Sequence, residues 1–308
     1  MKKYISGLMC LLISTVLCAQ QGRLEDRDHL IFLTQEWKGE RFKDGRPKVS
    51  DELLNRLRKI GTEQVWTILR GLGYNNQYAG NFMKLHDDQP FVGRALTAQY
   101  MPLRPDLEKR LIENGKKEGR IGPMNSWPID MLQKGDVYVA DCFEKITNGT
   151  LIGDNLATSI FTKTGTGVIF DAAARDIDGQ ASITGFNAYV RGWDPSFLTE
   201  AMLVRINGPL IIGEVTVLPG DLVLARREGV VFIPSHLAQE VVINSEFVML
   251  RDEFAIQRLK AGVYTPGQID TAWTDVIKQD FLNWIKQNPN LLPMSREELD
   301  NLMKNRTW

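Results

Sequence analysis

Apolar residues in the first third of the chain recur every three to four positions, which predicts helices with one buried face. Ser50 can cap the first of these helices, whose apolar side consists of Leu53, Leu54, Leu57 and Ile60. A second helix begins near Thr62 and ends at Gly71 or Gly73. Residues 105–117 are mostly charged, so we predict that they form a surface helix.

Short apolar runs bounded by turn residues predict the β-strands. These runs lie at residues 91–101, 136–143, 167–172, 182–190, 209–218, 221–226 and 230–233. Pro219-Gly220 and Glu228-Gly229 separate the last three runs, and such short turns favour a β-meander. We therefore expect a sheet-forming centre that follows the first helices.

Three helices are predicted after the meander. The first runs from Ser235 to about Lys260, and the second starts at Thr265 with proline in its first helical position. The third starts at Ser295, where Glu298 completes a capping box. The order of elements predicts an α/β fold with a mixed sheet at residues 50–245, an N-terminal arm at 20–49 and a C-terminal helical extension at 246–308. We expect the arm to lie over the body or over a neighbouring subunit.

A dinucleotide-binding fold is excluded by the position of the glycine-rich run. Gly165-Thr166-Gly167 stands before a predicted strand. A phosphate-binding glycine loop follows a strand and opens a helix instead. We interpret this run as a helix stop.

The first 19 residues predict a secretory signal peptide, because a short basic start and an apolar stretch precede a small-residue cleavage site at Ala19. We therefore expect the mature protein to be exported, to the periplasm or beyond. Two of the three cysteines lie in this signal, which leaves Cys142 alone and rules out an intrachain disulfide. Cys142 stands in an apolar strand pattern, and we interpret it as a buried, inert thiol rather than a nucleophile.

Charge changes the picture little. Removal of the signal leaves 35 basic against 38 acidic side chains, a net charge of about −3. Nucleic-acid binding needs a basic face, so we expect no such partner. No later segment is long and apolar enough to predict a membrane span.

Residues 149–176 hold the most informative chemistry. A predicted helix starts within Gly153-Asp154-Asn155-Leu156, directly after a strand and loop. The free N–H groups of a helix start, together with its positive end, stabilise a carboxylate or phosphate. The alternative is that Asp154 only caps its own helix.

Arg175 and Asp176 form the second candidate, at the end of the run Asp171-Ala172-Ala173-Ala174. Arginine suits a bidentate grip on a carboxylate, and a single aspartate suits a Mg²⁺ ion that keeps most of its waters. Neighbouring residues of an extended chain point to opposite sides, so we expect the two side chains not to pair with each other. The alternative is a surface salt bridge in a turn.

Other candidates carry weaker signals. The three histidines have no metal-binding spacing, and no GxSxG motif is present to support a hydrolase triad. Arg94, Arg104 or Arg191 could bind a second acid group of a substrate, although nothing local distinguishes one of them. Five tryptophans are expected to fill cores or interfaces rather than to stack on sugars: Trp66, Trp127, Trp193, Trp273 and Trp284.

The chain resembles the RraA-like family, which includes class II 4-hydroxy-4-methyl-2-oxoglutarate aldolases and the regulator of ribonuclease E activity. The resemblance covers roughly residues 50–245. It rests on five ordered blocks, at residues 91–95 (FVGRA), 135–137 (GDV), 153–157 (GDNLA), 167–176 (GVI…RD) and 218–234 (LPGD…GVVFIP). It implies a swivelling β/β/α-type core and assembly as a homotrimer or homohexamer, with sites between subunits.

By resemblance to the aldolase branch, Asp176 is the residue expected to bind Mg²⁺ or Mn²⁺, and Arg175 to contact the carbonyl side of bound pyruvate. The backbone amides of Gly153, Asp154, Asn155 and Leu156 would hold the pyruvate carboxylate, and Asp154 would reach metal-bound water. Where the family usually has glycine before the Arg-Asp pair, this chain has three alanines. We expect them to narrow the floor of the pocket.

The implied activity is that of a metal-dependent carbon–carbon lyase. It would cleave or decarboxylate small 2-oxo acids, such as 4-hydroxy-4-methyl-2-oxoglutarate or oxaloacetate, through an enolate of pyruvate. The competing hypothesis is a non-catalytic binding or regulatory protein of the same family. Export argues against ribonuclease E as its partner, because that enzyme works in the cytoplasm.

Overall fold

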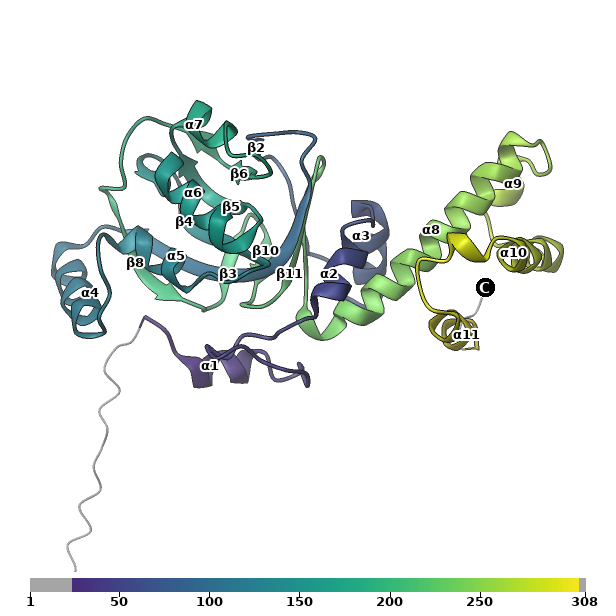
Figure 1. Cartoon of the computed structure of the whole chain (residues 1–308), viewed down its shortest axis with the longest axis horizontal. Coiled ribbons are helices and arrows are strands. Elements are labelled where there is room, and N and C mark those ends of the chain that lie inside the picture. Colours follow the sequence, from purple (N-terminus) through teal and green to yellow (C-terminus); the bar gives the residue numbers. More distant parts are fainter. Residues whose placement is uncertain (1–23, 305–308) are drawn as a thin grey trace, which may run out of the picture.

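A ten-stranded mixed sheet forms the centre of the protein in the computed structural model, which describes residues 24–304 (Figure 1). The strands along the main path follow the order β1-β12-β11-β3-β4-β5-β6-β2, while β7 pairs with β5 and β8 pairs with β3. Their bounds are β1 Tyr78–Ala79, β2 Met83–Lys84, β3 Phe91–Pro102, β4 Asp136–Thr150, β5 Val168–Ala174, β6 Ala188–Val190, β7 Gly192–Trp193, β8 Ala201–Ile206, β11 Leu222–Arg226 and β12 Gly229–Ile233. A separate hairpin joins β9 Leu210–Ile212 to β10 Val215–Val217.

The sheet is parallel in its middle and antiparallel at its sides. Strands β3, β4, β5 and β6 run parallel to one another, whereas β11 and β12 on one side and β2 on the other are antiparallel to their neighbours. Parallel neighbours need crossovers, and α6 (Asp154–Thr164) supplies the one between β4 and β5. The α/β class with a mixed sheet, predicted from the sequence, is confirmed.

The side chains of β4 alternate between two separate cores, as a period of two requires. On β4, Tyr138 and Ala140 face a core that also contains residues of α6. Val137 and Val139 face the opposite core, which the β9–β10 hairpin covers. Cys142 belongs to the first core and is fully buried, as predicted, and burial raises the pKa of its thiol to about 12. The thiol is therefore neutral at physiological pH.

Helices cover the sheet and extend beyond it (Figure 1). The N-terminal predictions are confirmed, because α2 follows the Ser50 cap, α3 starts at Thr62 and α4 spans residues 105–117. The described helices are α1 Arg27–Leu33, α2 Asp51–Leu57, α3 Thr62–Gly71, α4 Pro105–Lys117, α5 Trp127–Met131, α6, α7 Ile177–Ala181, α8 Ala238–Lys260, α9 Pro266–Ile269, α10 Asp275–Gln287 and α11 Arg296–Lys304.

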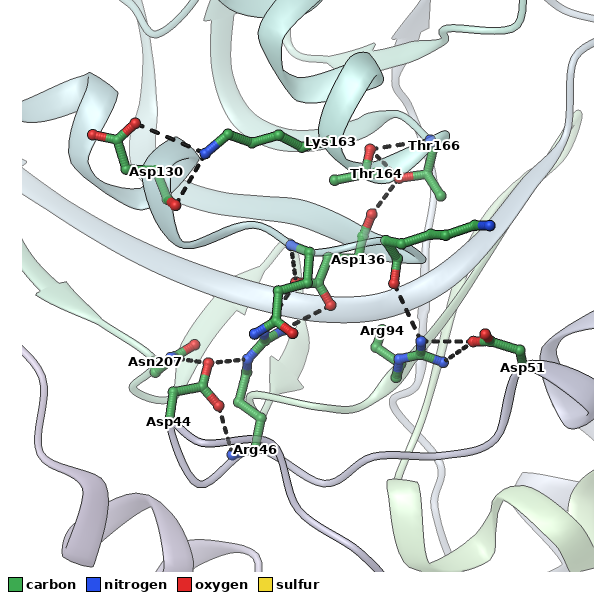
Figure 2. A network of polar contacts seen from close by, with 12 residues as sticks. Asp44, Arg46, Asp51, Arg94, Asp130, Asp136, Lys163, Thr164, Thr166 and Asn207 are labelled. Atoms are coloured by element: carbon green, nitrogen blue, oxygen red, sulfur yellow. Dashed lines mark hydrogen bonds and ion pairs between the residues drawn. The ribbon is translucent and has the colours of Figure 1, made fainter.

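The segment that precedes α2 is fastened to the sheet by a buried ion pair, shown in Figure 2. Arg46 donates to both carboxylate oxygens of Asp136, at 3.0 and 2.9 Å, and both side chains are 0% exposed. Asp44 accepts a further bond from Arg46 Nε at 2.7 Å. The segment that we predicted as an arm therefore lies against the body of its own chain.

Beyond the sheet, α8 runs outward and α10 and α11 pack around its far half (Figure 1). Aromatic rings fill the contact, with Phe254 close to both Phe281 and Trp284. Arg56 of α2 ties the extension to the core, because it pairs with Glu246 at 2.6 Å and with Glu298 at 2.9 Å. The predicted capping box is present, since Ser295 Oγ accepts from the Glu298 N–H at 3.1 Å.

Several details of the predicted strands are wrong. The run at 182–190 is a strand only at β6, because α7 and a turn occupy the residues before it. The predicted strand 136–143 continues to Thr150, with left-handed residues at Phe143, Glu144 and Asn148. The 209–218 run folds into its own hairpin instead of the meander. The strands β1, β2, β7 and β8 were not predicted.

Two predictions concern the membrane and export. None of the helices among residues 24–304 has the length and apolar character needed to cross a membrane. The predicted signal peptide lies outside the described residues.

Candidate functional site

The two sequence candidates lie at the same edge of the sheet, where the neighbouring parallel strands β4 and β5 end. The chain leaving β4 stays beside β5, because the Leu151 N–H donates to Ala173 O and the Arg175 N–H donates to Ile152 O, each at 3.0 Å. This pairing sets the start of α6 directly next to the turn after β5. Crevices at the carboxyl ends of parallel strands are the usual ligand sites of α/β sheets.

Glycines allow the two segments to touch. A β-carbon on Gly153 would sit 2.2 Å from Asp176 Oδ2, far closer than any real contact. A β-carbon on Gly179 in α7 would likewise lie 2.7 Å from Asp154 Oδ2. Residues 153–154 and 175–179 therefore make direct contact within one subunit.

Asp176 takes an unusual backbone conformation at the centre of this contact. Its φ of 58° and ψ of 49° are left-handed, which costs roughly 1–2 kcal/mol for a residue with a side chain. Gln180 stabilises this turn by donating hydrogen bonds to the carbonyl oxygens of Asp176 and of the preceding Arg175. Its N–H donates to Asp176 O at 2.9 Å, and its side-chain amide donates to Arg175 O at 2.6 Å.

The prediction that Arg175 and Asp176 would point apart is wrong. It assumed an extended backbone, whereas the left-handed turn brings Arg175 Nη1 to 3.8 Å from Asp176 Oδ2. The pair is loose and open, with side chains 31% and 38% exposed. Both groups are therefore accessible to a ligand.

The N-cap of α6 is Gly153, one residue before the Asp154 cap that the sequence predicted. Gly153 occupies the N-cap position without a side chain to cap the helix, and Asp154 is the first helical residue. Asp154 Oδ1 accepts from the Asn155 N–H at 2.7 Å, so that amide is already engaged. The other N–H groups of the first turn need an acceptor, as at every helix start.

A hollow of about 440 Å³ lies beside Arg175 and Asp176. Its other wall consists of Trp193, Asp194 and Pro195, which β7 brings alongside the end of β5. The exposed ring of Phe197 stacks over the Arg175 guanidinium at 4.5 Å from the ring centroid. None of the three alanines before Arg175 lines the hollow, so they do not narrow its floor.

Sequence reasoning did not identify three of the residues around this site. Trp193 was grouped with the core tryptophans, although it is only partly buried and faces the hollow. Phe197 is a lone aromatic residue in a polar loop, which is the one signal that could have drawn attention to it. Nothing local marks Gln180, because its role depends on the shape of the preceding turn.

The other arginines that we considered are engaged elsewhere. Arg94 pairs with Asp51 at 2.8 Å, Arg104 pairs with Asp106 at 2.8 Å, and Arg191 pairs with Asp171. Since Arg94 and Arg191 are also largely buried, they are structural residues in this fold.

The donor set at this edge fits a hydrated divalent cation. No group of three or more histidine, cysteine or acidic side chains among residues 24–304 could form an all-protein cage. Asp176 instead offers an exposed carboxylate whose ion-pair partner is 3.8 Å away. One or two carboxylates with several waters is the usual arrangement for Mg²⁺. Asp176 is therefore the residue that could hold such an ion.

The sequence of this chain matches a known protein family. Residues 47–232 match the family model RraA-like, described as Aldolase/RraA. Protein DlpA of Legionella pneumophila is 27% identical over 192 residues, which are 62% of this chain and 28% of DlpA. A protein of Halalkalibacterium halodurans named "Putative 4-hydroxy-4-methyl-2-oxoglutarate aldolase" is 29% identical over 119 residues, 39% of this chain and 56% of that protein. The match thus spans less than two thirds of either relative.

Solved structures share the fold. RraAS2 of Streptomyces coelicolor, described as an unusual member of the RNase ES inhibitor RraA protein family, superposes with a TM-score of 0.58 at 26% identity. That likeness covers 68% of this chain and 100% of RraAS2. An uncharacterized protein from Pseudomonas syringae has a TM-score of 0.60 at 23% identity, covering 72% and 94% of the two chains, and supports the fold alone. Because the family model matches more than half of the chain, this protein belongs to the RraA-like family.

Proposed function

We propose that the protein is a divalent-metal-dependent lyase that releases pyruvate from 2-oxo acids. Its reactions would be aldol cleavage of compounds such as 4-hydroxy-4-methyl-2-oxoglutarate and decarboxylation of oxaloacetate. One observation carries the proposal: the start of α6 and the Arg175–Asp176 turn touch through Gly153. Membership of a family described as Aldolase/RraA supports it.

Substrate binding would use the chain's own donors. The uncapped first turn of α6 offers N–H groups and the positive end of an eleven-residue helix to the substrate carboxylate. Arg175 adds a planar guanidinium that can bind a carboxylate through two hydrogen bonds. Together they would orient the 2-oxo group toward Asp176.

Bond cleavage leaves negative charge on the 2-oxo oxygen as the enolate forms, and the guanidinium of Arg175 would stabilise that charge. Mg²⁺ or Mn²⁺ at Asp176 would supply Lewis-acid polarisation of the same carbonyl when bound. Asp154, which is partly exposed and lies against Gly179, would move a proton through water. The resemblance to the aldolase branch implies these roles for Gly153, Asp154, Asn155, Leu156, Arg175 and Asp176. The Asn155 N–H, which donates to Asp154 Oδ1, would have to leave that acceptor to bind the substrate carboxylate.

Pyruvate release from oxaloacetate, measured with a coupled dehydrogenase assay, tests this function. The purified protein is assayed with Mg²⁺, with excess EDTA, and after Mg²⁺ or Mn²⁺ is restored. We expect activity that EDTA removes and either ion returns. Pyruvate release that ignores EDTA would reject the metal mechanism.

A non-catalytic regulator is the second candidate, because the chain resembles RraAS2 across that protein's whole length. This alternative predicts no pyruvate release above the metal-ion background with any 2-oxo acid. A panel of 2-oxo acids with added Mg²⁺ separates the two hypotheses.

We further propose that the chain assembles as a homotrimer or homohexamer and acts after export. Light scattering on the mature protein measures the assembly. Fractionation of cells that express the full chain, with N-terminal sequencing of the product, tests cleavage near Ala19.

A further inference from the structure

A second cavity, of about 410 Å³, lies at the ends of β11 and β12, which β3 and β4 separate from β5 and its Arg175–Asp176 turn. The start of β11 and the end of β12 are neighbours there, because Leu222 pairs with Ile233. The cavity shares no lining residue with the hollow beside Arg175. Its volume falls within the range of about 300–1,000 Å³ that is usual for small-molecule sites.

Asp221, directly before β11, lines this cavity and is only 4% exposed. The described part of the chain buries three other acidic residues, and each forms an ion pair with an arginine: Asp136 with Arg46, Asp171 with Arg191, and Glu246 with Arg56. Among residues 24–304, Asp221 has no such cation. Buried charges are normally paired, because removing an ion from water is costly. The charge of Asp221 is therefore the exception in this fold.

The groups of the described chain that bind the Asp221 carboxylate are neutral. The Leu218 N–H donates to Oδ2 at 2.8 Å, and the backbone of Ser235 also favours the ionised form. Burial outweighs both and raises the pKa of Asp221 to about 7. At pH 8 most molecules therefore carry an ionised carboxylate on the cavity wall without a counter-charge.

The rest of the cavity wall adds a second acid. Glu36, which is exposed on the N-terminal arm, acts electrostatically on His236. Desolvation lowers the pKa of His236, whose Nε2 lies 3.2 Å from the Tyr74 hydroxyl, so this ring is neutral at pH 8. No lysine or arginine of the described chain lines the cavity. A concave surface with charge of one sign attracts the opposite charge, so this cavity favours a cation.

Apolar surface lies next to these acids. Leu33, Leu218 and Pro234 are half-buried on the wall, as is the ring of Tyr74. They can cover the apolar stem of a ligand whose charged end is at the carboxylate. Leu33 belongs to the arm, which precedes the residues 47–232 that match the family model. Part of this wall therefore comes from outside the region that defines the family.

We propose that this cavity binds a small organic ammonium ion, with its charge at Asp221 and its apolar stem against Leu218 and Tyr74. An N–H group of the ammonium donates to the carboxylate and supplies the missing positive charge. Glu36 adds a weaker attraction, because its exposure to solvent screens it. The cavity is separate from the proposed active site, so this inference does not depend on the lyase function.

Isothermal titration calorimetry at pH 8 tests the proposal, with the full assembly and Mg²⁺. Phenethylammonium is compared with 2-phenylethanol, a neutral molecule of the same shape. The amine remains charged, because the pKa of an alkylammonium such as lysine is about 10.4. We expect the amine to bind about tenfold more tightly than the alcohol, since only the amine neutralises Asp221. Equal affinities, or no binding of the amine, would overturn the proposal.

Three variants locate the ion. Asp221→Asn keeps an oxygen acceptor for the Leu218 N–H and removes the charge, so the affinity for phenethylammonium should fall about tenfold while that for 2-phenylethanol stays within about twofold. Glu36→Gln should weaken amine binding about twofold, because that acid is exposed. Glu297→Gln, at an exposed acid on α11, is the control and should change neither affinity.

Circular dichroism shows whether Asp221→Asn is folded at pH 8. Native amine affinity in the folded variant would place the ion elsewhere and overturn the assignment to Asp221. If that variant does not fold, Glu36→Gln decides the question, because its substitution lies on the surface of the arm. Amine affinity in Glu36→Gln equal to that in Glu297→Gln would then overturn the proposal.

Discussion

Two arginine–aspartate pairs in this protein have the same chemistry and opposite surroundings. Arg46 and Asp136 are completely buried and joined by two hydrogen bonds of 2.9 and 3.0 Å. Arg175 and Asp176 stand 3.8 Å apart at the sheet edge, about a third exposed. The first pair has satisfied its charges internally, whereas the second leaves them available to a ligand. The two pairs therefore have the same residue types. They differ in burial and in the distance between the charged groups, and only the exposed pair could perform chemistry.

Breaking the buried Arg46–Asp136 pair should have the largest effect on the free energy of unfolding. Asp136→Asn leaves the buried guanidinium of Arg46 with Asp44 as its remaining charged partner and removes the two hydrogen bonds to a buried carboxylate, so we expect a loss of about 3 kcal/mol in the free energy of unfolding. Urea denaturation measures this loss. Asp106→Asn, in the exposed pair with Arg104, is the control and should leave stability unchanged. The double variant Arg46→Met/Asp136→Leu should recover most of the loss, and a failure to recover would show that the pair does more than neutralise itself.

Asp221 extends the comparison to a buried acid without a cation. Its carboxylate accepts the Leu218 N–H at 2.8 Å, and burial raises its pKa from 3.8 to about 7. Between these values the folded state holds a proton that the unfolded state has lost. The contribution of Asp221 to stability is therefore fully present below about pH 4 and is lost as the pH rises to about 7, by roughly 4 kcal/mol at most. Asp221→Asn should flatten this part of the urea-denaturation profile against pH, and an unaltered slope would refute the assignment to Asp221.

Removing Arg175 from the exposed pair should lower activity without changing the stability of the fold. Arg175→Met removes the cation but keeps the packing under Phe197, and we expect kcat/KM for oxaloacetate to fall about 100-fold, or about 2.7 kcal/mol. The melting temperature should not change, because the pair is exposed. Arg104→Met serves as the control at another exposed pair. Activity within threefold of the native protein would remove Arg175 from the site.

Substitution of Gln180 tests whether activity requires the left-handed turn at Asp176 that positions the Arg175–Asp176 pair. Gln180→Met removes the bond to Arg175 O while it keeps the side chain's length. We expect kcat/KM to fall about tenfold and the free energy of unfolding to fall by about 1–2 kcal/mol. The exposed Gln279→Met on α10 supplies the control. A stability loss with unchanged kinetics would leave Gln180 a purely structural role.

Local signals in the sequence predicted most helices well. Ser50, Thr62 and Pro105 mark helix starts that the structure confirms. Strand pairing was harder, because β8 joins β3 across about a hundred residues and only the tertiary fold determines that contact. The hairpin β9–β10 was merged with the meander for a different reason: its short turn at Gly213 was not recognised within the apolar run 209–218.

At the candidate site, the sequence motifs identified the right segments but not their geometry. The left-handed backbone of Asp176 depends on Gln180 and on the close approach of Gly153, neither of which a pattern of neighbours predicts. The N-cap at Gly153 was missed because aspartate is the better capping residue by propensity. Phe197 reaches Arg175 only through the fold of its loop.

The most direct test of the account is a titration of the metal-free protein with Mn²⁺, followed by electron paramagnetic resonance and by pyruvate release from oxaloacetate on the same samples. The account predicts one tightly bound ion per chain, with activity rising in proportion to occupancy. Asp176→Asn should lose both, with an unchanged thermal melt. Asp275→Asn, at a fully exposed aspartate on α10, should lose neither. Native turnover by Asp176→Asn, or by protein that binds no ion, would contradict the central claim.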